Sequence, residues 1–144
     1  MRNLTYFVLL VAITSCSQRE ETPAGSNSTH SIKLGALDKE PLKKFTYKDV
    51  AIFTIASMMG QDPASIEAKL DGDVYHLKYS RKSDDKMFFY KVTFKGRKVI
   101  WGIKDGRWRN SDADEKISFI EKGNSVEIIQ TFSDGSESID KYPL

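Results

Sequence analysis

The chain has 144 residues, of which 40% are hydrophobic and 29% are charged, a composition typical of an ordinary globular protein with room for one domain. Its 22 Lys and Arg residues against 20 Asp and Glu residues leave a formal charge of +2, which is too small to indicate a nucleic-acid-binding protein. The single cysteine excludes an internal disulfide, and with it a disulfide-stapled mini-protein.

The N-terminus has the pattern of an export signal. A short positive start, Met1-Arg2-Asn3, precedes an apolar stretch from Leu4 to Ile13 that only Thr5 interrupts, and small residues follow it. About ten apolar residues form a helix of roughly 15 Å, which is too short to cross a hydrocarbon core of about 30 Å. We therefore predict that residues 1–15 are a signal peptide that is removed.

The end of this segment, Ile13-Thr14-Ser15-Cys16, resembles the lipobox of bacterial lipoproteins. The resemblance implies that Cys16 becomes the mature N-terminus, with a thioether-linked diacylglycerol and an amine acylated by a chain such as palmitate. Two or three acyl chains hold a domain at a membrane where one would not. By analogy with sorting in enteric bacteria, Ser17 favours the outer membrane, facing the periplasm. The alternative is an ordinary secreted protein in which Cys16 is a free thiol.

A change of composition separates a tether from a folded domain. Residues Ser17 to Glu40 are rich in Ser, Thr, Asn and Gly. Their apolar side chains are few and follow no regular spacing. We predict a lipidated cysteine and flexible tether over residues 16–40, and a single domain over residues 41–144. A flexible chain of about 24 residues would allow the domain to lie a few tens of Å from the lipid.

The domain is predicted to open with one helix. Thr46 is a suitable N-cap, Asp49 completes a pair of the capping-box type, and Gly60 supplies a C-terminal stop. The residues between them form a wide apolar stripe, which predicts a helix packed on a sheet. The stripe consists of Val50, Ile52, Phe53, Ile55, Ala56 and Met59.

After the helix the apolar period changes to two, which indicates strands. Tight-turn signals separate the strands, and no helical pattern lies between them, which favours an antiparallel meander of about six or seven strands and an α+β fold. Val99, Trp101 and Ile103 are predicted to share the inward face of one strand. The turn signals are Asp71-Gly72, Lys95-Gly96, Gly123-Asn124 and Asp134-Gly135.

Groups that could carry chemistry are scarce. His30 falls in the tether, and His76 falls on a strand, on the face opposite Leu77, so no histidine cluster can bind zinc and a catalytic triad would depend on His76 alone. No glycine-rich phosphate loop and no HExxH motif are present. The acidic stretches at Asp84-Asp85 and at residues 112–115 are interpreted as solvated turns. We therefore predict no enzyme, no catalytic residue, no metal and no cofactor; a periplasmic enzyme using Asp or Glu is the less favoured alternative.

The small net charge conceals a division along the chain. Residues 78–109 contain eleven basic and three acidic side chains, a balance of +8, whereas residues 110–144 contain three basic and eight acidic ones, a balance of −5. Both tryptophans lie in the basic part. Arginine forks and indole faces suit an anionic or sugar-like ligand or a protein interface. The candidate binding surface consists of Arg107, Trp108 and Arg109, with Arg97 and Trp101 as neighbours.

The alternative interpretation of this segment is structural. In it, Trp101 belongs to the core, Trp108 covers an edge of the sheet, and the arginines pair with the acidic C-terminal strands. The segment is also similar to patterns in small exported bacterial proteins, but that resemblance transfers no functional residue. The residues that carry it are Trp101-Gly102, Gly106-Arg107-Trp108-Arg109 and Asp134-Gly135-Ser136.

The expected function follows from the predicted anchor and the missing catalytic groups. We expect a membrane-anchored bacterial envelope lipoprotein that acts as a non-catalytic binding or inhibitory module. Its expected partners are the membrane, through the lipid on Cys16, and an envelope protein or anionic ligand, but no nucleic acid. The alternative is a structural accessory subunit of an envelope assembly such as a secretion or conjugation machine.

Overall fold

A computed structural model describes residues 39–144 as one helix followed by a seven-stranded antiparallel sheet, so the predicted α+β class is confirmed. The predictions for residues 1–38, including the signal peptide and Cys16, lie outside the described residues. The elements are α1 (Tyr47–Met59), the short 3₁₀ helix η1 (Pro63–Ser65), β1 (Glu67–Asp71), β2 (Val74–Arg81), β3 (Lys86–Lys95), β4 (Lys98–Ile103), β5 (Lys116–Lys122), β6 (Ser125–Thr131) and β7 (Glu137–Pro143).

The predicted signals fix both ends of α1. The Thr46 hydroxyl accepts a hydrogen bond from the Asp49 backbone N–H, and the Asp49 carboxylate accepts one from the Thr46 N–H, which completes a capping box. The helix ends at Gly60, whose φ of 60° is left-handed, a conformation that costs glycine little. Among the described residues, no helix has the length and hydropathy needed to cross a bilayer.

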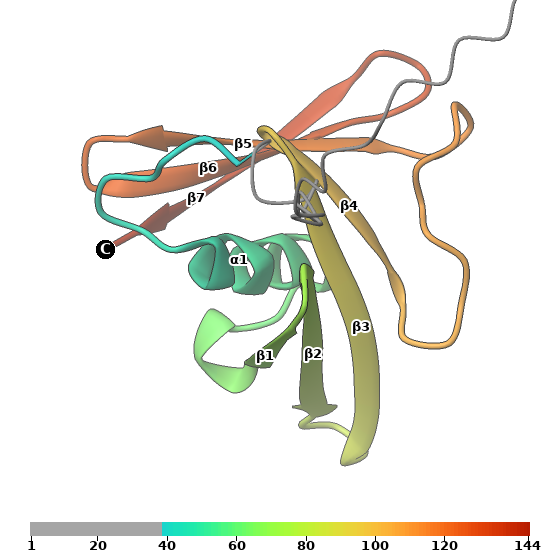
Figure 1. Cartoon of the computed structure of the whole chain (residues 1–144). Coiled ribbons are helices and arrows are strands. Elements are labelled where there is room, and N and C mark those ends of the chain that lie inside the picture. The colour runs from blue at the N-terminus through green and yellow to red at the C-terminus, as the bar shows by residue number, and fades with distance from the viewer. Residues whose placement is uncertain (1–38) are drawn as a thin grey trace, which may run out of the picture. The chain divides into compact units, whose positions relative to one another are not determined.

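The sheet is a pure meander in which each strand pairs with the next along the chain. It bends between β4 and β5, where only two residue pairs, Lys98 with Ser118 and Val99 with Ile117, join the strands. Figure 1 shows α1 lying in the angle between the wing of β1–β3 and the wing of β5–β7. Because α1 contacts β1, β2, β3 and β6, it buries side chains on more than one side.

The core lies between the helix and the inner face of the sheet. Phe94 is its aromatic centre, with ring centroids 4.8 Å from Tyr47, 5.8 Å from Phe119 and 5.9 Å from Tyr75. Val92 and Ile128, from the two wings, are fully buried beside them. Truncation of a fully buried Phe to Ala typically costs about 3–5 kcal/mol, so this junction contributes strongly to the stability of the domain.

One inward assignment from the sequence is wrong. Ile103 was expected to share the core with Val99 and Trp101, but it is 62% exposed. It is the last residue of β4 and lies opposite Tyr90, where the chain leaves the sheet for the following loop. Alternation therefore identified the correct face of the strand but not where the cover of that face ends.

Candidate functional site

The loop between β4 and β5, residues 104–115, joins these strands where they diverge (Figure 1). The Arg109 N–H donates a 2.7 Å hydrogen bond to the Trp101 carbonyl, which extends the free edge of β4 by one residue pair. The loop also crosses the outer face of the sheet at Gly102, where an added Cβ would lie 2.6 Å from the Arg107 carbonyl oxygen. Glycine is required there because the loop backbone approaches so closely.

Asp114 holds this loop together. Its side chain is only 2% exposed and accepts two hydrogen bonds from the Arg107 guanidinium, at 2.7 and 2.6 Å. Ser111 adds two more, from its backbone N–H at 2.9 Å and from its hydroxyl at 2.6 Å. Because these donors favour the charged form, the pKa of Asp114 lies far below its usual range. The interpretation of residues 112–115 as a solvated turn is therefore wrong at Asp114, although Asp112 is exposed.

Arg109 and Trp101 share a second carboxylate. The Arg109 guanidinium lies 5.0 Å from the centre of the Trp101 ring, and its Nη2 lies 3.3 Å from Glu115. The Trp101 indole N–H donates to the same carboxylate at 3.1 Å, while the ring is buried in the core. Trp108 is half-buried, with Lys91 Nζ 4.7 Å from its ring centre.

Four of the five predicted surface residues therefore come together, and Arg97 does not. Arg97 lies at the opposite end of β4, where its Nε is 2.6 Å from Glu40. The guanidinium donors of Arg107 and Arg109 face Asp114 and Glu115, so the arginines pair with carboxylates, but the structural interpretation named the wrong partners. The acidic partners come from the loop itself rather than from the C-terminal strands, because both precede β5.

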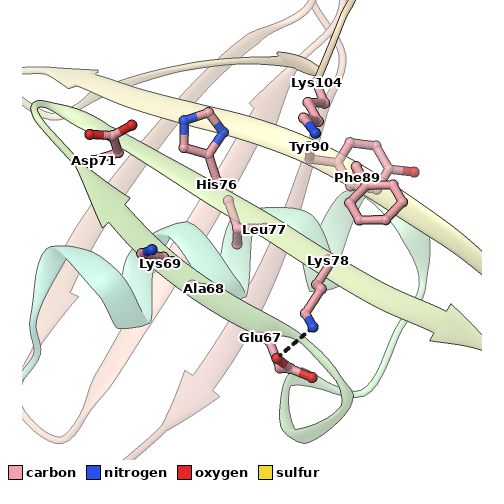
Figure 2. A pocket seen from close by; sticks show the side chains of 10 residues that line it. All are labelled: Glu67, Ala68, Lys69, Asp71, His76, Leu77, Lys78, Phe89, Tyr90 and Lys104. Carbon is pink, nitrogen blue, oxygen red and sulfur yellow. Dashed lines mark ion pairs between the residues drawn. The ribbon is translucent and has the colours of Figure 1, made fainter.

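A hollow of about 530 Å³ lies beside this loop, over the outer face of β1–β3. Figure 2 shows its cationic and aromatic side chains arising from three strands and from the start of the loop. It is lined by Glu67, Ala68, Lys69, Asp71, His76, Leu77, Lys78, Phe89, Tyr90 and Lys104. It combines several cations with exposed ring surface, which the hollow lined by Lys43, Lys44 and Arg97 does not.

The cations of the hollow are unequally engaged. Lys78 Nζ lies 3.0 Å from Glu67 (Figure 2), whereas no ion pair within residues 39–144 joins Lys69 or Lys104 to a carboxylate. Lys104 is positioned by its backbone N–H, which donates to the Phe89 carbonyl at 3.0 Å, and its Nζ lies 5.6 Å from the Phe89 ring. Phe89 is 44% exposed. The hollow thus offers two ammonium groups that pair with no carboxylate among the described residues, and an exposed aromatic ring over which one of them, Lys104, already lies.

The sequence alone did not predict this site, because its residues come together only through strand register. The pairing of β1, β2 and β3 places Lys69 opposite His76 and Lys78 opposite Phe89. The placement of His76 on the face opposite Leu77 is correct, since His76 is exposed and Leu77 is buried. The available signal was the alternation of charged residues on that outer face. Lys104 could not be added from the sequence, because it belongs to a loop.

Comparisons with protein-family models, with curated proteins and with solved structures give no match. Within residues 39–144, no group of three or more His, Cys, Asp and Glu side chains is placed to bind a metal ion. The candidate site therefore rests on its geometry alone.

Proposed function

We propose that this protein is a membrane-anchored bacterial envelope lipoprotein that acts as a non-catalytic binding or inhibitory module. In this proposal the lipid on Cys16 holds it at the outer membrane, on the periplasmic side, and the folded domain binds a ligand. The lipobox-like sequence Ile13-Thr14-Ser15-Cys16 supports the anchor. The hollow over β1–β3 supports the binding role.

The ammonium groups of Lys69 and Lys104, which pair with no carboxylate within residues 39–144 and line the same hollow as the exposed Phe89, are the observation that carries the binding proposal. Ligand sites typically combine apolar or aromatic surface with a few polar groups that fix orientation. Two lysines and an aromatic ring in one hollow suit a ligand that carries a negative charge next to a flat or ring-shaped apolar part. Glu67 and Asp71 at the rim disfavour a ligand of high negative charge.

NMR titration with phenyl phosphate as the probe and phenol as its neutral counterpart tests the binding proposal. Phenyl phosphate should shift the signals of His76 and Phe89, and phenol should shift them much less. The double variant Lys69→Gln/Lys104→Gln should weaken the response at least tenfold. The matched control Lys48→Gln/Lys141→Gln removes two exposed lysines that do not line the hollow and should leave it unchanged. Equal loss in both variants would mean that the probe responds to overall charge, and the hollow would not be a site.

The anchor is tested separately by fractionation and by mass spectrometry of the mature N-terminus. The natural chain should partition with membranes and begin at an acylated Cys16. The Cys16→Ala variant should leave the membrane fraction. If that variant remains in the membrane, or if the natural N-terminus carries no lipid, the anchoring part of the proposal is wrong while the binding part stands.

The free edges of the sheet favour one second candidate, a structural accessory subunit of an envelope assembly. β1 and β7 each pair with one strand only within residues 39–144, and β7 exposes Ile139. An edge strand can accept a strand from a partner protein. Isolation of the lipidated protein from a mild detergent extract distinguishes the two: a stable stoichiometric partner supports the assembly role, and recovery of the protein alone contradicts it.

A further inference from the structure

Basic side chains gather at the end of the domain where the described chain begins. The entry segment contributes Lys43 and Lys44, the β3–β4 turn contributes Lys95, Arg97 and Lys98, and the β5–β6 turn contributes Lys122. These segments are neighbours, because Pro41, Lys43, Lys44, Arg97, Glu121 and Gly123 line one shallow hollow of about 280 Å³. A hydrogen bond between Lys44 and Asn124 also joins the entry segment to the β5–β6 turn. We call this surface the tether end.

Three acidic groups at the tether end are already engaged. Glu121 accepts hydrogen bonds from the backbone N–H groups of Lys43 and Lys44, both at 2.7 Å, and thereby fixes the entry segment. Glu40 pairs with Arg97 at 2.6 Å, and Asp73 lies 3.7 Å from Lys39. Within residues 39–144 no carboxylate pairs with Lys43, Lys95 or Lys98. These three lysines are exposed, and no ion pair within the described residues offsets their positive charge.

We propose that the tether end docks on the anionic lipid surface of the membrane that holds Cys16, an inference that rests on the proposed anchor. Twenty-two residues separate Cys16 from Lys39, and a chain of that length spans at most about 80 Å in any conformation. The anchored domain therefore stays close to the membrane, and each lysine near an anionic surface favours contact about fivefold.

This docking leaves the candidate binding site accessible. The hollow lies over the outer face of β1–β3, and the loop of residues 104–115 lies at the end of β4 opposite Arg97 (Figure 1). A domain that rests on its tether end thus holds the loop away from the lipid, together with the hollow except for Asp71 at the β1–β2 turn. The orientation is electrostatic and should weaken as salt screens the charges.

Lysine acylation of the lipidated protein in vesicles tests the orientation. The vesicles contain phosphatidylcholine alone or with 30% phosphatidylglycerol, and labelled residues are read by mass spectrometry. With phosphatidylglycerol, Lys43, Lys95 and Lys98 should react at least threefold more slowly, and this protection should disappear in 0.5 M NaCl. Lys82 and Lys86, at the opposite end of β3, are exposed internal controls and should react equally in both vesicles.

A matched pair of charge reversals completes the test. Lys95→Glu/Lys98→Glu should abolish the protection of Lys43, whereas Lys82→Glu/Lys86→Glu, with the same change of charge, should preserve it. Uniform labelling in both vesicles, or protection of Lys69 and Lys104 instead, would overturn the proposal, the latter because the face with the hollow would then dock. Failure of the anchor gives a different result, since the protein would then not incorporate into phosphatidylcholine vesicles at all.

Discussion

The loop of residues 104–115 and the neighbouring hollow use similar side chains in opposite ways. In the loop, Arg107 and Arg109 face the carboxylates of Asp114 and Glu115. In the hollow, Lys69 and Lys104 have no carboxylate partner within residues 39–144, and Lys104 lies over the exposed ring of Phe89. The comparison shows that cations and aromatic rings close together in sequence can be structural, while those assembled across strands remain available to a ligand.

The chemistry of the two cations fits this division. Arginine has a planar fork that matches both oxygens of a carboxylate, as Arg107 does with Asp114 at 2.7 and 2.6 Å. Lysine carries a flexible, strongly hydrated point charge that can meet an incoming anion without a fixed geometry. The arginines of the loop are therefore engaged in defined ion pairs, whereas the lysines of the hollow carry charges without a carboxylate partner among the described residues.

Removal of the carboxylate at Asp114 should have the largest effect on this comparison. Asp114→Ala leaves Arg107 and Ser111 without their common acceptor, and we expect the melting temperature to fall by about 10 °C. Circular dichroism during heating measures it. The control is Asp112→Ala, two residues away, which is exposed and lies 3.7 Å from Lys116, and which should change the melting temperature by less than about 2 °C. Equal losses in the two variants would contradict a structural role specific to Asp114.

A side chain added at Gly102, under the loop backbone, should have the next largest effect on stability. Gly102→Ala places a Cβ 2.6 Å from the Arg107 carbonyl, and the forced shift of the loop should cost about 1–3 kcal/mol in chemical denaturation. Gly106→Ala, in the same loop, is the matched control, because its Cβ would lie 3.5 Å from the nearest atoms, an ordinary contact. A harmless Gly102→Ala would show that the loop does not hold its position over β4.

Lowering the pH should weaken the loop by a smaller amount, which the melting temperature will show. The pKa of Asp114 is lowered in the folded state from an ordinary value of 3.8, so its contribution to stability is complete above that value and decreases as the pH falls toward the folded pKa. Between pH 5 and pH 2, Asp114→Asn should therefore lose less melting temperature than the natural protein. Asp84, whose pKa is lowered to about 2 by the Arg81 guanidinium, provides an exposed comparison, since solvent weakens that pair. If Asp84→Asn reduces the pH dependence of the melting temperature as much as Asp114→Asn does, the buried carboxylate contributes no more to stability than the exposed one.

Local signals were sufficient for the fold, and contacts between distant segments were not. Thr46, Asp49 and Gly60 determine the ends of the helix within a few residues of chain, and alternation with tight turns gives the meander. The inward prediction for Ile103 was wrong, because exposure at the end of a strand depends on which other segments cover it. The degree of bending between β4 and β5, which creates the space for the loop, has no signature in either strand alone.

The candidate site divides in the same way. Arg107 and Asp114 are seven residues apart, so both were visible in the sequence, but their pairing depends on how the loop closes. The hollow needed the register of β1 on β2 and of β2 on β3 before Lys69, His76 and Phe89 could be placed on one surface. The arginines and tryptophans of the loop could thus be selected from the sequence by residue type. The residues of the hollow could not, because only strand pairing brings them together.

The smallest expected effect on stability belongs to the hollow, and it is the most informative for function. Lys69→Gln/Lys104→Gln removes two charges that have no ion-pair partner within the described residues, so the melting temperature should change by less than about 2 °C. Arg107→Gln/Arg109→Gln removes two charges as well, but from groups that face Asp114 and Glu115, and should lower it clearly. Thermal denaturation of the two double variants side by side measures the difference. If the lysine pair costs as much as the arginine pair, the lysines stabilise the fold, and the hollow loses the uncommitted charges on which the proposed binding function depends.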